Sequence, residues 1–308
     1  MTTPVSRAAP SWWPPGAVGC FDDLMAYRLV GASACADRIT SALSAVAVES
    51  ERRRRSVAAD VEAAGDLLCD LKPDTALYRN IVRVIARSAS DGGGEGVRWT
   101  CDRLSGRRRA AQEEVVRVAA AALADTEVLL VHDFSSMVVR ILGALGTARR
   151  VVVTSGEPLG QGPRVARLAA AAGHAVTYVP DMSVGRVIGE VDTFVTGVES
   201  FYRDGSLANT VGSLSIGLLC RHVGVPVLAP AELLKCDGDV PTAVRARLTA
   251  RLLTAWPRDP LPGGAAVVDY VLDAVPAELV TSYATEEGVL PPSEVGAHAA
   301  AALAEPLT

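Results

Sequence analysis

Lysine is almost absent from this chain of 308 residues: Lys72 and Lys235 are its only lysines, and arginine supplies nearly all other basic groups. Together with the abundance of alanine, valine and glycine, this bias indicates a GC-rich bacterial coding sequence. Aromatic residues make up only 5% of the chain, but hydrophobic residues make up 49%, which is enough for a sizeable core. The formal net charge is −5, so the composition shows no basic excess of the kind that nucleic-acid binding needs.

Two arginine clusters, Arg52–Arg55 and Arg107–Arg109, stand out against this balance. Either cluster could be interpreted as a nucleic-acid patch. Each lies in a stretch with helical spacing, however, so we favour two solvated helix faces. We therefore expect no nucleic-acid partner.

Other absences limit the class of protein further. The sequence has no run of about 18 apolar residues, so we expect no membrane span. Residues 1–19 lack the apolar core of a signal peptide. The six cysteines include no CxxC pair and have no metal-ligand spacing with the four histidines. We expect reduced cysteines, a cytoplasmic protein, no metal site and no cofactor.

The first part of the chain carries helical signals and little else. Apolar residues recur at helical spacing over residues 32–48, 57–71, 77–86 and 107–124. Lys72-Pro73 and the glycine-rich stretch 90–96 are the breaks between these segments. Residues 1–124 are therefore predicted to form an all-helical domain.

From about residue 126 the pattern changes to strands that alternate with helices. The run EVLLVHD (127–133) is typical of a strand buried on both faces of a parallel sheet. Further strands are predicted over 151–154, 175–179, 193–196 and 226–229, with helices over 135–145, 164–172 and 212–222 and a short one from 181. This alternation predicts an α/β fold for residues 125–308, a Rossmann-like doubly wound and mostly parallel sheet. In such sheets ligands bind at the carboxyl ends of the strands.

The loop TSGEPLGQG (154–162) follows one of these strands and contains Gly156, Gly160 and Gly162. Glycines let the backbone approach a ligand, and the next helix would offer free N–H groups to a phosphate, with Arg164 in its first turn. The loop lacks the dinucleotide pattern GxGxxG, and a tight turn with ordinary caps is the alternative.

Several polar residues at other strand ends have two possible roles. His132 and Asp133 could be acid–base partners. Alternatively, Asp133 could cap the helix that follows. Glu199 is unusually polar for a structural connection, and Asp204-Gly205 is standard turn chemistry. Asn209 is either a functional residue or the cap of the next helix.

Lys235 is notable because lysine is so scarce, but with Glu232 it could form only an exposed ion pair of little energetic value.

The segment VTGVESFYRDGSLANTVGSLSIGLLCRHVGVPVLAPAELLK (195–235) resembles the signature of the translation initiation factor 2B alpha/beta/delta family. That family includes ribose-1,5-bisphosphate isomerase and methylthioribose-1-phosphate isomerase. VLLVHDFSSMVVRIL, EPLGQGPR and YVLDAVPAELVTSYATEEGVLPPSEV resemble three more of its segments in the family's order, so that the resemblance covers most of residues 27–295.

The resemblance implies a catalytic acid–base pair at Asp133 and Glu199, where the family's isomerases have a cysteine and an aspartate. It also implies a phosphorylated small-molecule ligand and a homodimer formed through the α/β domain. With the glycine-rich loop, it gives the expected ligand-binding residues Lys72, Gly156, Gln161, Gly162, Arg164, Asn209 and Lys235. This chain departs from the family pattern at Thr210, where a lysine is usual, and at Glu157, where an arginine is usual.

Two functions remain open from the sequence. The first is a sugar-phosphate aldose–ketose isomerase in which the two carboxylates carry out the acid–base chemistry. The alternative is a non-catalytic regulatory protein that binds a sugar phosphate or a nucleotide. Nucleotide exchange in translation would rest on family analogy alone, which is weak support.

Overall fold

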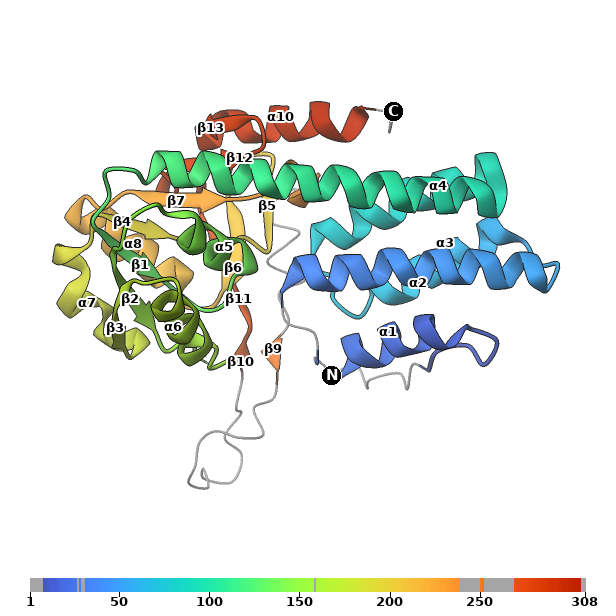
Figure 1. Ribbon diagram of the computed structural model, residues 1–308, viewed down its shortest axis with the longest axis horizontal. Coiled ribbons are helices and arrows are strands. Elements are labelled where there is room, and N and C mark those ends of the chain that lie inside the picture. The colour runs from blue at the N-terminus through green and yellow to red at the C-terminus, as the bar shows by residue number, and fades with distance from the viewer. Residues whose placement is uncertain are drawn as a thin grey trace, which may run out of the picture. The chain divides into compact units, whose positions relative to one another are not determined.

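The computed structural model describes residues 8–26, 28, 31–157, 159–238, 250–251 and 269–305. Backbone contacts divide the chain into two compact units, residues 1–110 with 305–308, and residues 111–304. The elements of both units are labelled in Figure 1. Helix α4 (Ala76–Ala122) begins in the first unit and ends in the second.

The described part of the first unit is helical, as predicted. It contains α1 (Pro15–Met25), α2 (Ala32–Arg52), α3 (Val57–Cys69) and the first part of α4. Apolar side chains at helical spacing, such as Ile39, Leu43 and Val46 of α2, are fully buried. Helix α4 consists of two helices that join at Gly93, whose φ of 56° and ψ of −145° are non-helical. The glycine-rich stretch therefore interrupts the helix where a break was predicted.

The basic clusters of this unit differ from each other. Arg52 and Arg53 are exposed and pair with Glu49 on the same helix, which agrees with a solvated face. Arg108 is only 3% exposed and its Nη1 lies 2.6 Å from Asp37. For Arg108 the interpretation as a solvated residue is wrong, because the guanidinium is held inside the helical unit by a carboxylate.

A seven-stranded sheet forms the centre of the second unit. Its strands lie in the order β13 (Gly288–Leu290), β12 (Ser282–Thr285), β7 (Val227–Pro230), β4 (Thr193–Val195), β1 (Val128–Val131), β2 (Arg150–Thr154) and β3 (Ala175–Val179). All neighbouring pairs are parallel except β12 and β13. This is the mostly parallel sheet that the sequence predicted.

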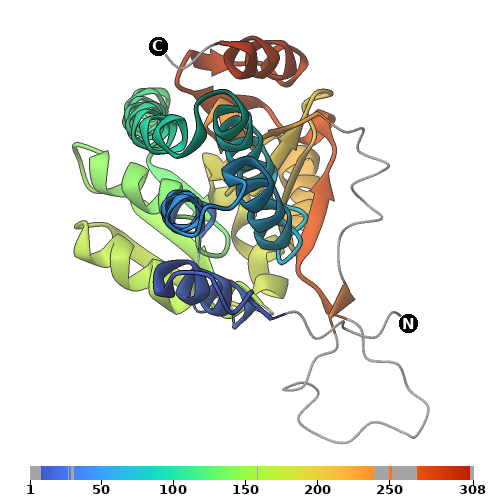
Figure 2. The ribbon, with the colours of Figure 1, turned by 90° about the vertical axis from the view of Figure 1, so that its right-hand side faces the viewer.

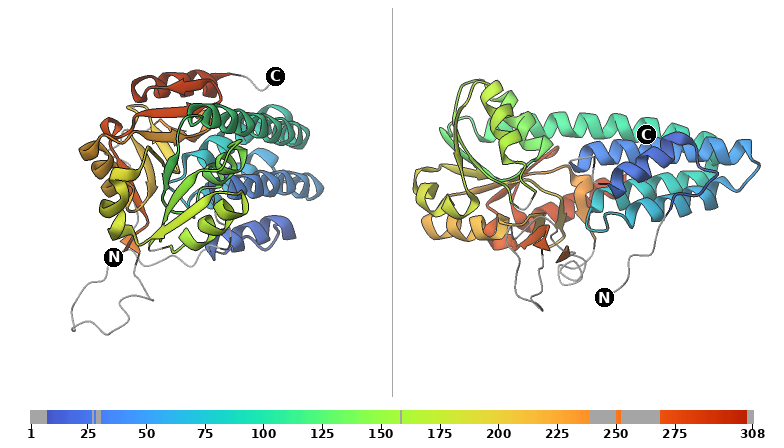
Figure 3. Two further views of the ribbon diagram at one scale, coloured as in Figure 1. Left: turned by 60° about the vertical axis from the view of Figure 1, so that its left-hand side comes forward. Right: turned by 90° about the horizontal axis from the view of Figure 1, so that it is seen from below.

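Helices cover both faces of this sheet (Figure 3). On one face, Leu129 and Val131 of β1 pack with α5 (Ser136–Ala144), α6 (Gly162–Ala171) and the end of α4. On the other face, Leu130 packs with α7 (Val184–Val187) and α8 (Ser213–Val223). Because successive strand residues point to opposite faces, an uninterrupted apolar run is what a doubly covered strand requires.

The sequence did not predict a second, four-stranded sheet (Figure 2). Its strands lie in the order β11 (Leu272–Val275), β6 (Leu207–Thr210), β5 (Ser200–Tyr202) and β8 (Cys236–Asp237). Further elements are the pair β9 (Ala250–Arg251) and β10 (Asp269–Tyr270), the turns η1 (Asp181–Ser183), η2 (Ile188–Glu190), η3 (Leu233–Lys235) and η4 (Ala277–Leu279), and α10 (Pro292–Ala304). The second sheet and α10 share a core that includes Phe201, Leu207 and Val295.

The β5–β6 hairpin turns at Asp204-Gly205, as predicted. The Asp204 carboxylate accepts hydrogen bonds from the Ser206 backbone N–H and hydroxyl, and Gly205 has a φ of 81°. A Cβ at Gly205 would lie 2.2 Å from the carbonyl oxygen of Pro292, at the start of α10. This turn therefore needs glycine both for its backbone conformation and for close packing.

Replacing Gly205 with alanine is expected to lower the free energy of unfolding by about 2 kcal/mol or more, because strain at positive φ adds to the clash with Pro292. Gly189→Ala is the matched control, since no atom lies within 4 Å of its added Cβ, and it should change stability by less than about 0.5 kcal/mol. Urea denaturation measures both values. Equal midpoints for the two variants would contradict the expectation.

Candidate functional site

The order of the strands defines where a ligand can bind. From β1 the chain continues to β2 and β3 on one side, and then to β4 on the other side of β1. In doubly wound sheets a crevice opens at such a switch point, outside the carboxyl ends of the two strands. His132 and Asp133 follow β1, and Gly197 follows β4 after one residue.

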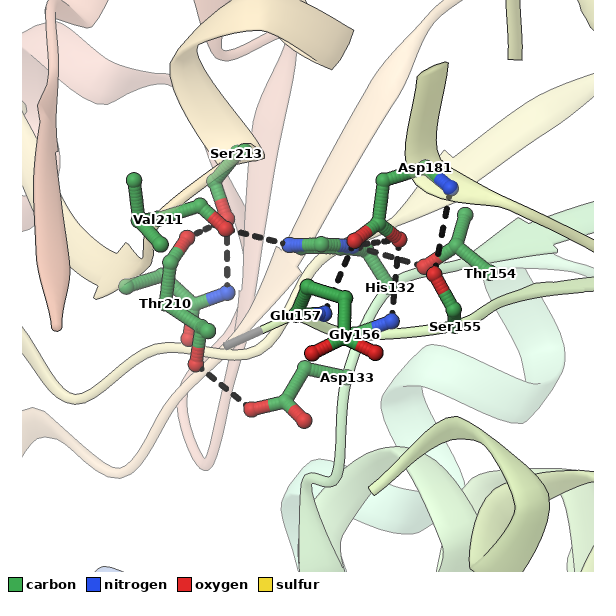
Figure 4. Close-up of polar contacts among 12 residues, drawn as sticks. His132, Asp133, Thr154, Ser155, Gly156, Glu157, Asp181, Thr210, Val211 and Ser213 are labelled. Atoms are coloured by element: carbon green, nitrogen blue, oxygen red, sulfur yellow. Dashed lines mark hydrogen bonds and ion pairs between the residues drawn. The ribbon is translucent and has the colours of Figure 1, made fainter. Parts of the chain in front are cut away.

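Asp133 is a strained and almost fully buried carboxyl group at this switch point (Figure 4). It is 5% exposed, and its φ of 56° lies in the left-handed region that non-glycine residues rarely adopt. Its Oδ2 accepts a hydrogen bond from the Thr210 hydroxyl at 2.7 Å, whereas Oδ1 is buried without a hydrogen-bond partner. Burial raises the pKa of Asp133, and the Thr210 hydrogen bond offsets only part of the rise. Strain, an unsatisfied oxygen and a raised pKa together are typical of functional residues.

The interpretation of Asp133 as a helix cap is wrong. Helix α5 begins at Ser136, and the Ser135 hydroxyl caps it by accepting a hydrogen bond from Val138 N. The Asp133 side chain points instead to Thr210 (Figure 4). Gly156 leaves room for this carboxyl group, since a Cβ there would lie 2.8 Å from Asp133 Oδ1.

His132 is locked between two elements by both of its ring nitrogens. Nε2 lies 2.8 Å from the carbonyl oxygen of Val211, and Nδ1 lies 2.7 Å from the Thr154 hydroxyl. A carbonyl oxygen can only accept, so Nε2 carries a proton. Gly212 packs against the ring, where a Cβ would lie 2.8 Å from Nε2. The neighbours His132 and Asp133 thus bind the neighbours Val211 and Thr210.

The glycine-rich loop binds a carboxylate of the protein itself. The N–H groups of Gly156 and Glu157 donate to the two oxygens of Asp181 at 2.9 and 2.8 Å, and Asp181 Oδ1 lies 3.7 Å from His132 Nδ1 (Figure 4). Gly162 N donates to the Ser155 carbonyl oxygen at 3.1 Å. In this conformation the amides of Gly156, Glu157 and Gly162 therefore already have acceptors, and a bound anion would depend on side chains.

Three polar side chains of the loop and of the first turn of α6 are exposed or half-buried. Gln161 is half-buried and its Nε2 donates to the Leu159 carbonyl oxygen at 3.3 Å. Arg164 is exposed, and its guanidinium lies over the ring of Phe134. The side chain of Glu157 is also exposed.

Asn209 lies in β6 and does not cap the following helix. Its Nδ2 donates to the hydroxyls of Ser213 at 2.9 Å and Thr196 at 3.4 Å. A Cβ at Gly197 would lie 2.8 Å from Asn209 Oδ1, so β4 and β6 approach closely at this point. The interpretation as a cap is wrong because a carboxylate, and not the amide of Asn209, accepts from the first N–H groups of the helix.

That carboxylate is Asp273 of β11. Its Oδ2 accepts from the N–H groups of Gly212 at 2.8 Å and Leu214 at 3.0 Å, at the first turn of α8. Asp273 was not predicted from the sequence, because it lies 61 residues beyond Gly212 and has no local signal. An acidic residue at a helix N-terminus also stabilises the helix dipole.

Glu199 and Lys235 lie near each other along the second sheet. Glu199 is half-buried, directly precedes β5, and donates its backbone N–H to Ala208 O of β6. Lys235 is 5% exposed and its ammonium group donates to the carbonyl oxygen of Val198 at 2.6 Å. The expectation of an exposed pair with Glu232 is wrong, because Glu232 is fully buried and accepts a hydrogen bond from Gln112.

Lys72, the other lysine, lies in the turn between α3 and α4 of the first unit and is half-buried. The remaining predicted residues belong to the second unit. In the ranges that the structure describes, no group of three or more His, Cys, Asp or Glu side chains could hold a metal ion. No helix in those ranges is both long enough and apolar enough to cross a membrane.

Glu286 is a half-buried carboxyl group at the same end of the sheet, after β12. Both of its oxygens accept from Leu233 N, at 3.0 and 3.1 Å, so it holds the segment after β7. Burial raises the pKa of Glu286 from 4.5 to about 7, and the charges of Glu232 and Glu287 add to the rise. No local pattern indicates this, because the TEEG segment has the composition of an exposed turn.

Glu286→Gln is expected to stabilise the protein above about pH 7 and to leave it unchanged near pH 4. The pKa of the folded protein exceeds that of the unfolded chain, so the cost of charging Glu286 is absent below about pH 4.5 and complete above about pH 7. The gain should be about 1–3 kcal/mol, and the glutamine keeps an acceptor for Leu233 N. Denaturation across this pH range, with exposed Glu278→Gln as control, measures it. A gain that does not depend on pH would refute the assignment.

Comparisons with known proteins agree on the family. The model of the family described as "Initiation factor 2 subunit family" matches residues 29–292. Ribose 1,5-bisphosphate isomerase of Haloferax volcanii is 26% identical to the chain, over 89% of the chain and 87% of that protein. Methylthioribose-1-phosphate isomerase of Nitratidesulfovibrio vulgaris is 29% identical over 49% of the chain and 46% of that protein.

A solved structure shows the same fold. The translation initiation factor eIF-2B of Pyrococcus horikoshii OT3 has a TM-score of 0.78 at 20% identity, and the match covers 91% of this chain and 98% of that one. The resemblance predicted from the motifs is thereby confirmed. Since the family match extends over most of its length, the chain belongs to the Initiation factor 2 subunit family.

Proposed function

We propose that this protein binds a phosphorylated sugar at the carboxyl ends of β1, β2 and β4 and interconverts its aldose and ketose forms. Asp133 and Glu199 act as the acid–base pair. The observation that carries the proposal is Asp133, a buried carboxyl group in a strained conformation with a raised pKa and one oxygen without a partner. Relatives named as ribose 1,5-bisphosphate isomerases, similar over most of their length, support the reaction class.

The chemistry needs two groups with different proton affinities. The base removes a proton from the carbon beside the carbonyl, so that the C–H electrons form the double bond of an enediol. The acid gives its proton to the carbonyl oxygen or, in a sugar 1-phosphate, to the ring oxygen as the ring opens. The protonated base then returns its proton to the former carbonyl carbon, and the deprotonated acid takes the proton of the second hydroxyl, which becomes the new carbonyl, so that both groups are regenerated. Because burial raises the pKa of Asp133 above that of an ordinary aspartate, we assign the acid role to Asp133 and the base role to Glu199.

The expected ligand-binding residues divide into two groups in this proposal. Gln161 and Arg164, whose side chains extend from α6 and the loop before it, contact the phosphate directly. Asn209 and Lys235 hold the hairpin that carries Glu199, through Ser213 and the Val198 carbonyl oxygen. Gly156 and Gly162 provide space. The role of Lys72 in ligand binding remains a prediction from the resemblance. The homodimer remains a prediction.

One observation favours the alternative, a regulatory protein that binds its ligand without converting it. Asp181 already occupies the amides of Gly156 and Glu157, which reduces the number of donors for a highly charged phosphate group. Binding without turnover is therefore the outcome that this alternative predicts. A ligand at 100 times its dissociation constant should stabilise the protein by about 2.7 kcal/mol in either case.

The test is turnover of ribose 1,5-bisphosphate and of methylthioribose 1-phosphate, with the ketose product followed by NMR. Asp133→Asn and Glu199→Gln should each lower kcat by about 100-fold or more, because each removes one proton-transfer group. Glu190→Gln is the control: Glu190 is an exposed carboxylate that pairs with Arg150. Ligand-induced stabilisation without any ketose would select the regulatory alternative. Full activity of Asp133→Asn would exclude the proposed pair.

A further inference from the structure

Arg164 has an unusual environment for an exposed arginine. It lies in the first turn of α6, and its Cζ atom sits over the ring of Phe134, 4.0 Å from the ring centroid. Phe134 directly follows Asp133, so the ring joins the carboxyl end of β1 to the beginning of α6. A guanidinium on the face of an aromatic ring is held by a cation–π interaction and by stacking.

None of the residues that the structure describes accepts a hydrogen bond from this guanidinium. Across the described ranges, the Arg164 side chain takes part in no hydrogen bond or ion pair, and the exposed Glu157 of the neighbouring loop does not pair with it either. Arg117 and Arg150, in contrast, bind Glu114 and Glu190 through their donors. Arg164 therefore carries a full charge and five N–H groups that remain available.

The stacking on Phe134 holds the Arg164 guanidinium and leaves its N–H groups available. Contact through the flat face restricts the guanidinium but uses none of its N–H groups, which lie in its plane. An ion pair with a carboxylate would hold the side chain equally well, but it would use two of the donors. A planar fork with free donors matches a phosphate group, and the positive end of the ten-residue helix α6 lies beside it.

We propose that Phe134 is a positioning residue that holds Arg164 ready to bind the phosphate of the ligand. The ring keeps the guanidinium beside the crevice with its donors free, so the phosphate lies toward α6 and the reacting carbons lie toward Asp133. This inference rests on the proposed function for its phosphorylated ligand. It goes beyond that function by assigning Phe134, an apolar residue, to the orientation of the substrate.

A double-mutant cycle tests the proposal through the Kd of ribose 1,5-bisphosphate, measured by calorimetry at low ionic strength. Phe134→Leu should raise Kd about two- to five-fold, as expected for loss of one exposed cation–π contact, and Phe134→Tyr should retain the wild-type Kd. Arg164→Gln should raise Kd about tenfold or more. In the Arg164→Gln background, Phe134→Leu should have no further effect.

Equal weakening by Phe134→Leu in both backgrounds would overturn the proposal, since the ring would then act without Arg164. Phe134→Met, which also removes the ring, replaces the leucine variant if that variant melts earlier than the wild type. If the effects of Phe134→Leu and Arg164→Gln on Kd are coupled but no ketose forms, the isomerase activity is refuted and this inference stands. Turnover with no coupling would remove only this inference. Failure of the wild type to bind the bisphosphate would overturn the ligand class on which both rest.

Discussion

The hydrogen bond between Thr210 and Asp133 is the contact on which the candidate site depends, because it ties the two sheets of the α/β unit together. Asp133 follows β1 of the seven-stranded sheet, and Thr210 ends β6 of the four-stranded sheet. The adjacent bond from His132 to the Val211 carbonyl oxygen doubles the link. With both bonds in place, the segment between β6 and α8 is fixed over the end of β1, and the hairpin that carries Glu199 is fixed with it.

This arrangement has an electrostatic consequence for ligand recognition. Backbone N–H groups at loops and helix ends are the usual means of binding phosphate. Here two of these positions are occupied by carboxylates of the protein, Asp181 at the glycine-rich loop and Asp273 at the start of α8. A phosphorylated ligand must therefore find its positive charge on side chains, and this gives the exposed guanidinium of Arg164 more importance than the loop sequence suggests.

Much of the fold could be predicted from the sequence because it follows from local patterns. The apolar run of β1 and the alternation of strands and helices identified the parallel sheet. Helix α1 was missed although Ala17, Cys20, Phe21 and Leu24 have helical spacing and are buried, so in that case the signal was present. The second sheet gave no such signal, because its strands have only two to four residues and pair with partners far along the chain.

The site was predicted less completely, since local chemistry suggested the wrong partners. Asp133 and Asn209 each stand where a helix cap would be reasonable, yet Ser135 and Asp273 serve those helices. Whether a residue caps a helix depends on the backbone angles of a few residues. The φ of 56° at Asp133 could not be predicted from the residues next to it. The burial of Lys235 and the partial burial of Glu286 likewise depend on tertiary packing that no local pattern encodes.

Two residues that differ from the family motifs meet at the Asp133–Thr210 contact. Asp133 stands where the isomerases have a cysteine, and Thr210 stands where a lysine is usual. A lysine at position 210 would place a positive charge beside the carboxyl group and favour its ionised form. Threonine donates a hydrogen bond of 2.7 Å without adding a charge, so burial dominates and the pKa of Asp133 is raised. With a lysine there, the charged form of the carboxyl group would be stabilised and its pKa held down. Threonine at position 210 is therefore what allows burial to keep the pKa of Asp133 raised, as the proposed acid role requires.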